Sequence, residues 1–301
     1  LLEESAATLV ETRRLIEGIQ NHWLIRKYVP PAEHTVLLNS RSMPGSDDGD
    51  AVEKARAQLN SARAAGDAGR IARSAYNLAL LLIERDETAE LTTLLEEVRL
   101  LAGDSPDSEV LAFLLEAQIE RGGGNVDAAL RAASRAEERL SRHHDDNLRL
   151  LSYLVLADLL CETGNPEDSK RSLRRSRRLA RKTSLAGLQA MNAGVRARVL
   201  LKQGKPREAA EAFEREADIL GDARYFSALI TAQEAAATAW EIAGRDAEAA
   251  EWYFRGGRSA EASGDESRAE SLFQRARKAA SRTTSEKLIA RISLLTGRAT
   301  T

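Results

Sequence analysis

The sequence contains few aromatic residues and a single cysteine. Phe, Trp and Tyr make up 4% of its 301 residues although 43% are apolar, so we expect a core built mainly from Ala, Leu and Ile. Such a core favours close packing of helices, whereas sheets are richer in β-branched and aromatic residues. Cys161 has no second cysteine to pair with, so the chain forms no internal disulfide. The composition predicts an all-α protein.

The sequence also lacks a charge imbalance and a long apolar run. Its 44 basic and 46 acidic residues give a formal net charge of −2, so we expect no overall attraction to nucleic acid. The longest apolar runs, such as residues 78–83, are too short to cross a bilayer. We therefore expect no nucleic-acid partner and at most a peripheral association with a membrane.

Glycines recur at a regular interval. Four of them are spaced 40 residues apart and a fifth follows after 20: Gly124, Gly164, Gly204, Gly244 and Gly264. Glycine just after a helix can adopt the left-handed conformation that satisfies the last carbonyls. Pro166 and Pro206 suit a first helical turn, which needs no amide donor. The spacing predicts helix pairs of about 40 residues, with Asp86 replacing the glycine in the earliest pair.

Residues from about 50 to 296 resemble the tetratricopeptide repeat family. Its repeats place small, small, bulky and small residues at fixed offsets around the turn glycine. The Gly264 frame supplies Gly257, Ala269, Phe273 and Ala276, and the Gly244 frame supplies Ala237, Ala249, Tyr253 and Gly256. Earlier frames depart at Glu216, which replaces a small residue, and at Ala133, which replaces a bulky one. The resemblance implies a right-handed α-solenoid of helix-turn-helix repeats.

The same resemblance implies a concave groove, lined by the first helix of each pair, that binds a protein or peptide segment. Carried over frame by frame, the groove residues are Leu114, Gln118 and Arg121; Leu154, Asp158 and Cys161; Gly194, Arg198 and Leu201; and Glu234, Thr238 and Glu241. Such a groove is apolar near its middle and acidic toward the last pair, which suits a peptide with basic and apolar anchors. The alternative is that these are exposed helix positions without a ligand.

One predicted helix carries a run of positive charge, KRSLRRSRRLARK, at residues 170–182. Leu173, Ser176 and Ala180 are three or four residues apart and mark its buried stripe. The charges then form either a solvated outer face or a basic patch for an acidic protein segment, a lipid headgroup or nucleic acid. The sequence lacks an interleaved aromatic residue that would stack on bases. The patch residues are Arg171, Arg174, Arg175, Arg178 and Lys182.

Groups that could carry catalysis or bind a metal are sparse. The run RHHDD at residues 142–146 has metal-ligand side chains, but adjacent histidines do not easily face one ion. Asp145 or Asp146 serves more simply as a helix N-cap. Cys161 lies in an apolar helix, which does not favour a nucleophile. The sequence therefore predicts neither an enzyme nor a bound cofactor or metal.

Residues 1–35 differ from the repeats. Apolar residues follow the helical period at Leu9, Ile16, Ile19 and Trp23, and two prolines end the pattern at residues 30 and 31. A polar linker at residues 36–50 separates this segment from the array at 51–301. We expect a tethered amphipathic helix that caps the first repeat, as the ends of solenoids require.

The segment LVETRRLIEGIQNHWLIRKYVPP, residues 9–31, also resembles the closing segment of bacterial mammalian-cell-entry (MlaD-like) lipid-transport proteins. The shared Trp-Leu-x-Arg element is Trp23, Leu24 and Arg26, and Tyr28 extends the docking residues. This resemblance implies an accessory role in a bacterial envelope lipid-transport system, with a periplasmic or envelope-associated location. The alternative function is a regulatory tetratricopeptide domain that senses a ligand or a peptide.

Overall fold

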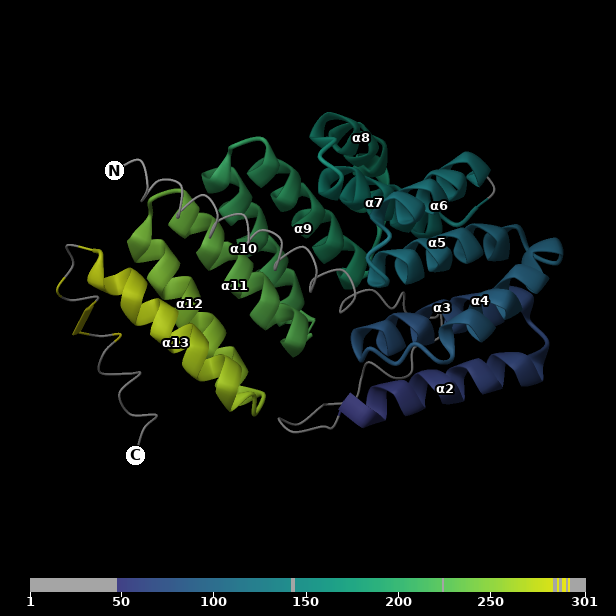
Figure 1. The fold of residues 1–301 in the computed structure, drawn as a ribbon, viewed down its shortest axis with the longest axis horizontal. Coiled ribbons are helices and arrows are strands. Elements are labelled where there is room, and N and C mark those ends of the chain that lie inside the picture. The colour runs from purple at the N-terminus through teal and green to yellow at the C-terminus, as the bar shows by residue number, and fades with distance from the viewer. Residues whose placement is uncertain are drawn as a thin grey trace. The chain divides into compact units, whose positions relative to one another are not determined.

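The computed structural model describes residues 48–141, 144–223, 225–283, 286, 289, 290 and 292 (Figure 1). Within these residues the regular secondary structure is entirely helical, with twelve α-helices and one short 3-10 helix. The predicted all-α class is confirmed. No helix in this part of the chain is long and apolar enough to cross a membrane.

The helices follow one another with short connections. In chain order they are α2 (Asp48–Ala65), α3 (Ala68–Glu84), α4 (Leu91–Leu100), η1 (Leu101–Gly103), α5 (Pro106–Gly122), α6 (Val126–Arg139), α7 (Asp146–Glu162), α8 (Pro166–Lys182), α9 (Ala186–Lys202), α10 (Pro206–Asp222), α11 (Phe226–Ile242), α12 (Asp246–Ala262) and α13 (Glu266–Ser281). Eight of them are 17 residues long, so most of the helices match in length. Pro166 and Pro206 begin α8 and α10 as predicted.

The turn residues adopt the predicted left-handed backbone. The five glycines of the repeat have φ between 70° and 81°, and Asp86 has φ 59° in the glycine's place. At Gly164 the amide of Asn165 donates to the carbonyl of Leu160 over 2.8 Å, which closes the end of α7. Gly66, between α2 and α3, has φ 66° and extends the series one turn further than the sequence indicated. The period of about 40 residues is confirmed.

The small residues predicted at fixed offsets allow close approach of neighbouring helices. Ala237 and Ala249 are fully buried. A Cβ on Gly257 of α12 would lie 2.5 Å from ring atoms of Phe273 on α13, closer than any side chain allows. Glu216, which departs from the family pattern, is also buried. The repeat pattern therefore describes the packing, and small residues are required where two helices meet most closely.

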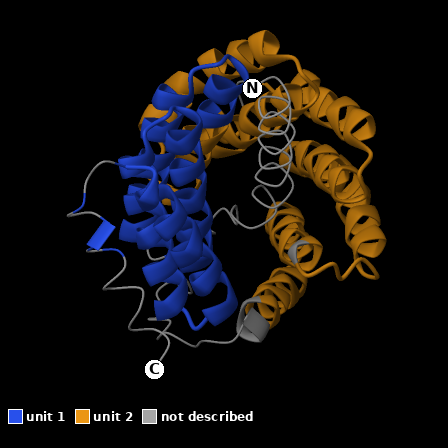
Figure 2. Ribbon diagram, turned by 60° about the vertical axis from the view of Figure 1, so that its left-hand side comes forward, with its two compact units in different colours: residues 1–24, 196–301 blue, residues 25–195 orange. Residues whose placement is uncertain are grey.

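The chain divides into two compact units (Figure 2). Unit 2 comprises residues 25–195, and its helices pack in sequence, α2 on α3, α3 on α4 and α5, α5 on α6, α6 on α7 and α7 on α8. Unit 1 comprises residues 1–24 and 196–301, and in it α10 packs on α11, α11 on α12 and α12 on α13. Sequential packing of this kind is that of an α-solenoid of tetratricopeptide-like repeats.

The predicted N-terminal helix and its docking residues, Trp23, Leu24, Arg26 and Tyr28, lie outside the described residues, as does the linker up to residue 47. The helix α2 begins at Asp48, three residues before the predicted start of the array.

Candidate functional site

Helix α11, the first helix of the last complete pair, carries a row of polar residues. Thr231, Glu234, Thr238 and Glu241 are three or four residues apart and therefore share one side of the helix. The side chains of Glu234 and Glu241 are 30% and 32% exposed, whereas Thr238 is buried. This row contains the three groove residues that the sequence placed in the last pair.

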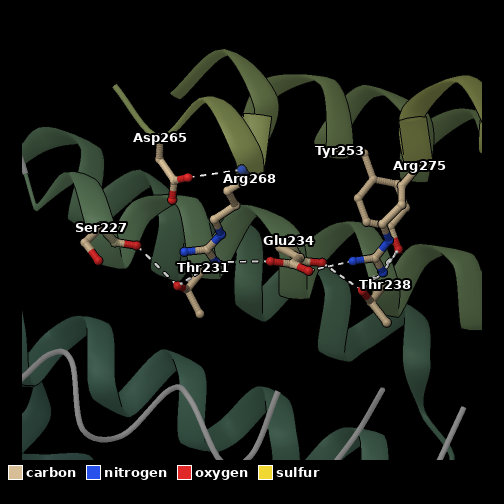
Figure 3. Close-up of polar contacts among 8 residues, drawn as sticks. All are labelled: Ser227, Thr231, Glu234, Thr238, Tyr253, Asp265, Arg268 and Arg275. Carbon is tan, nitrogen blue, oxygen red and sulfur yellow. Dashed lines mark hydrogen bonds and ion pairs between the residues drawn. The ribbon is translucent and has the colours of Figure 1, made fainter. Parts of the chain in front are cut away.

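Helix α13 brings three arginines to this row. Arg268, Arg275 and Arg282 are seven residues apart, about two helical turns, so they project in nearly the same direction. Asp265 caps the helix by accepting a hydrogen bond from the amide of Arg268 over 3.1 Å (Figure 3). The cap fixes where α13 begins and, with it, the position of the first arginine.

The arginines hold Glu234 from two sides. Nη1 of Arg275 lies 2.6 Å from Oε1 of Glu234, and Nη2 of Arg268 lies 3.1 Å from Oε2 (Figure 3). Arg268 also donates to the hydroxyl of Thr231 over 3.0 Å. The side chains of Arg268 and Arg275 are 23% and 25% exposed, so the cluster is ordered and still open to solvent. Ion pairs of this kind fix side-chain rotamers before any ligand arrives.

Tyr253 of α12 is buried and connects Glu241 with Arg275. Its hydroxyl donates to Glu241 over 2.8 Å and accepts a hydrogen bond from Arg275 over 2.5 Å, while the guanidinium of Arg275 sits 4.2 Å from the centre of the tyrosine ring. Burial raises the pKa of the Tyr253 hydroxyl, and the positive charge of Arg275 opposes that rise only in part. The hydroxyl therefore keeps its proton at neutral pH and remains a donor to Glu241.

The charges in this region are balanced. Arg282 joins Glu241 over 2.5 Å and Asp246 over 2.7 Å, so three arginines face three carboxylates. The sequence had indicated an acidic end because it considered α11 without α13. We call the partly exposed residues of this cluster the α11–α13 surface; they are Thr231, Glu234, Glu241, Arg268, Arg275 and Arg282.

The groove positions predicted in unit 2 lie in the core instead of on an open surface. The buried residues are Leu114, Gln118, Leu154, Asp158 and Cys161. Arg121 of α5 is 6% exposed and joins two acids of α7, with Nη1 3.0 Å from Asp158 and Nη2 2.6 Å from Glu162. This cluster connects the first helices of neighbouring pairs. A role in partner binding for these residues stays a prediction.

The remaining predicted groove residues lie on α9, where the division between the two units falls. Gly194 and Arg198 are buried, and Leu201 is half-buried.

The predicted basic patch lies on α8, but the predicted buried stripe of that helix is correct only at Ser176. The buried residues are Ser169, Ser172, Ser176 and Leu179, while Leu173 and Ala180 are only half-buried. Five patch residues are exposed as expected: Arg171, Arg174, Arg175, Arg178 and Lys182. Two of the buried serines donate to backbone carbonyls, Ser169 to that of Ala157 over 2.5 Å and Ser176 to that of Leu173 over 2.9 Å.

The histidine-aspartate run has a structural role in its described part. The amide of Ser141 donates to Nδ1 of His144 over 2.8 Å, which leaves Nε2 to donate to the carbonyl of Pro106 over 3.2 Å. Asp145 caps α7 by accepting hydrogen bonds from the amides of Asn147 and Leu148. The sequence had predicted that either Asp145 or Asp146 is the N-cap. No cluster of three metal-ligating side chains occurs among the described residues, which do not include His143.

Sequence reasoning missed the partners of the α11 row. Arg268, Arg275 and Tyr253 lie on later helices, and only the seven-residue spacing of the arginines hints that they share a face. Their importance depends on the packing of α13 against the preceding helices, which a pattern within one helix does not show.

No family model matches the sequence, and no curated protein is similar to it. Solved structures share its fold. A signal transduction ATPase with numerous domains and a tetratricopeptide repeat sensor, from Pyrococcus horikoshii, aligns with a TM-score of 0.56 at 14% identity, over 86% of this chain and 41% of that one. The apo form of RapI aligns with a TM-score of 0.50 at 11% identity, over 83% of this chain and 81% of that one.

A third structure, the APC/C hetero-tetramer Cut9-Hcn1, aligns with a TM-score of 0.50 at 12% identity, over 81% of this chain and 46% of that one. This chain therefore spans less than half the length of the ATPase and of the matched chain in the hetero-tetramer. At these identities the alignments show the fold alone. They agree with the helix pairs, turn residues and small-residue positions described above, so this chain has the fold of tetratricopeptide-like repeat proteins.

Proposed function

We propose that this protein is a non-enzymatic scaffold that binds a segment of a partner protein along the α11–α13 surface. The observation that carries the proposal is the position of Glu234, which is held between Arg268 and Arg275 while all three side chains remain partly exposed. A peptide that meets this cluster finds its donors and acceptors already oriented. Little side-chain entropy is then lost on binding.

The chemistry of the surface suits the backbone and polar side chains of a peptide. A guanidinium has five N–H donors, and Arg268 uses one terminal nitrogen, Nη2, for its bonds to Thr231 and Glu234. Its other nitrogens can donate to peptide carbonyls. Glu234 and Glu241 can accept from peptide amides or pair with a basic side chain. Because the charges are balanced, we expect a mixed polar segment and not a strongly basic one.

The solved structures of similar fold support a protein partner. One contains a tetratricopeptide repeat region named as a sensor, and another is a hetero-tetramer of two different proteins. These roles belong to the proteins of similar fold. For this chain they favour recognition of another molecule as the first role to test.

The experiment is a selection of peptides from a displayed random library on the full-length chain. We expect peptides that bind the parent chain and lose affinity by about tenfold or more with Arg275→Ala, because one charge-assisted contact of about 1.4 kcal/mol from a partly exposed side chain is removed. Arg268→Ala is a second variant in case Arg275→Ala impairs folding. The matched control is Arg258→Ala, since Arg258 is exposed on α12 and, among the described residues, forms an ion pair only with Glu261 one turn away. Selected peptides that bind all these chains equally contradict the proposal.

The alternative is a sensor, in which binding at α11–α13 alters the rest of the repeats. The similar structure with a sensor region favours this second candidate. Hydrogen exchange with and without a selected peptide separates the two roles. Protection limited to α11–α13 indicates a scaffold, and changed exchange in α5–α8 as well indicates a sensor.

A narrower role, as an accessory of a bacterial envelope lipid-transport system, rests on Trp23, Leu24 and Arg26, which lie outside the described residues. It is tested by affinity capture with the intact chain and with a chain that lacks residues 1–35, read by mass spectrometry. Recovery of envelope transport proteins only with the intact chain supports the role. Recovery of the same proteins by both chains contradicts it.

A further inference from the structure

Helix α8 presents arginines that the described structure does not neutralise. Arg174, Arg177 and Arg178 are exposed, and none of the ion pairs in the described residues involves them. Their neighbours differ, since Arg171 pairs with Asp168 over 3.1 Å and Arg175 pairs with Glu137 of α6. We call Arg171, Arg174, Arg177, Arg178 and Arg181 the α8 basic face.

The orientation of this face is fixed by the packing of α8. The helix buries Ser169, Ser172, Ser176 and Leu179, and it packs on α7 (Figure 1). At about 100° per residue, Arg174 projects directly away from that stripe, with Arg178 and Arg181 on either side of it. The packing of α8 on α7 therefore directs these arginines toward solvent.

The concentration of charge is unfavourable for the helix on its own. Within residues 170–182 four pairs of basic residues are three apart and five pairs are four apart, the spacings at which side chains are neighbours. Like charges at these spacings repel and destabilise a helix. Solvation of an outer face does not require this arrangement, since α10 and α12 mix acidic and basic residues on their exposed sides. An anionic partner would remove the repulsion.

We infer that the α8 basic face binds a short acidic segment of another protein. The run from Lys170 to Lys182 is about 18 Å long at 1.5 Å per residue. An extended segment of five or six residues covers about the same length, and its alternate side chains are about 6.6 Å apart. That spacing is close to the rise of about 6 Å between arginines four positions apart, such as Arg174 and Arg178. A segment with acidic residues at alternate positions therefore matches the face.

The surroundings favour a narrow ligand over a broad anionic one. Glu167 and Asp168 stand at the start of α8, and Glu137 lies beside it on α6, so carboxylates border the face at its end and along one side. A membrane or a nucleic-acid duplex would meet these carboxylates as well. Helix α8 has no aromatic residue to stack on bases and no exposed large apolar residue to insert into a bilayer. A single chain running along the helix avoids the bordering acids.

This site is on a different helix from the α11–α13 surface and belongs to the other unit, so it does not rest on the proposed function. It gives the protein a second binding surface that prefers a ligand of different charge. The α11–α13 surface is balanced in charge, whereas the α8 basic face requires an acidic ligand.

The test is fluorescence anisotropy with the full chain and a labelled peptide of about 12 residues in which Glu alternates with Ser. The same peptide with Gln in place of Glu is the ligand control. At about 150 mM salt, we expect binding of the Glu peptide only, and a loss of affinity of about tenfold or more in the triple variant Arg174→Glu, Arg177→Glu, Arg178→Glu. Replacement of the same three arginines by Gln should give a smaller loss in the same direction.

A matched control changes the net charge equally at scattered sites. The variant Arg207→Glu, Arg258→Glu, Lys278→Glu replaces three exposed basic residues of unit 1. We expect it to bind the Glu peptide within about twofold of the parent chain, because none of the three changed residues lies on α8. Circular dichroism should show the same helicity in all variants, since every changed residue is exposed.

Three results would overturn the inference. One is the absence of binding to the Glu peptide, and another is an equal loss of binding in the scattered variant. The third is tighter binding, lost in the α8 variant, to vesicles of phosphatidylserine and phosphatidylcholine or to poly(U) RNA at the same salt.

Discussion

Gly257 of α12 is a residue at which two helices of the described part of the chain come very close. A Cβ there would lie 2.5 Å from Cδ1 and Cε1 of Phe273, a ring that packing holds in place. The adjacent Gly256 differs, because its Cβ would lie 3.3 Å from Cδ1 of Leu272, the end of a flexible side chain. Both glycines are inside α12, so alanine at either position would gain the same helix propensity.

We predict that Gly257→Ala lowers the free energy of unfolding by about 1–3 kcal/mol, because the ring and the backbone must move apart. Gly256→Ala should change it by less than about 1 kcal/mol, since better helix propensity offsets a small shift of Leu272. Urea denaturation of the two variants measures the difference. Equal effects from both would show that the ring contact is not what requires glycine.

Tyr253 should make the stability of the protein sensitive to alkali. Burial raises the pKa of its hydroxyl in the folded chain above the ordinary value of 10.0. The neutral hydroxyl of Tyr253 then contributes fully to the free energy of unfolding below pH 10.0. This contribution is lost as the pH rises further, because the tyrosine ionises at a lower pH in the unfolded chain than in the folded chain. We predict that the free energy of unfolding falls less steeply above this pH in Tyr253→Phe than in the parent chain. Denaturation series at several alkaline pH values give the slopes, and equal slopes would contradict the assignment.

At the scale of the helices, the ends were the most predictable feature. Glycine spacing gave the turns, because a left-handed residue after a helix end strongly favours glycine. Asp86 is the exception, with φ 59° in a conformation that costs a residue with a Cβ about 1–2 kcal/mol. Its acceptance there shows that the repeat tolerates a strained turn at one position.

The turn provides a paired test. Asp86→Gly should raise the free energy of unfolding by about 1 kcal/mol, and Gly244→Asp should lower it by a similar amount, because both positions have positive φ. Thermal unfolding of the two variants measures the changes. If Asp86→Gly destabilises the chain, the side chain of Asp86 contributes more than its backbone strain costs.

The faces of the helices were predicted less well than their ends. On α8 the sequence predicted a buried stripe of Leu173, Ser176 and Ala180, and only Ser176 is buried. The rest of the stripe is Ser169, Ser172 and Leu179. Hydrophobicity ranks serine as polar, but a serine that bonds to a backbone carbonyl can be buried at little cost. The order of residues along one helix does not show which carbonyl of α7 will be within reach.

The candidate site could be predicted in part. The offsets of the repeat found Glu234, Thr238 and Glu241, but they did not show that arginines 34 to 41 residues later would pair with them. In unit 2 the same offsets gave Arg121 and Asp158, which pair with each other in the core. A charged residue in a sequence is expected at the surface, and only tertiary structure shows when its partner allows burial.

At the scale of the whole molecule, one repeat architecture carries two surfaces of different chemistry. The α11–α13 surface combines three arginines with carboxylates that neutralise them. The α8 basic face includes three arginines, Arg174, Arg177 and Arg178, that form no ion pair with the described residues. In stacked repeats each pair contacts mainly its neighbours, so a surface can change in one pair without loss of the fold in the others. This independence suits a scaffold that binds more than one protein segment.

The most direct test of the central claim, that the α11–α13 surface binds a protein segment, is site-specific photo-crosslinking with a selected peptide. A photoreactive phenylalanine analogue replaces Thr231, which lies in the surface beside Arg268, and in a second chain it replaces Arg258 on the exposed side of α12. We predict that the peptide crosslinks at position 231 and not at position 258, with the attachment site mapped by mass spectrometry. Equal crosslinking at both positions, or crosslinking at position 258 alone, would contradict the account.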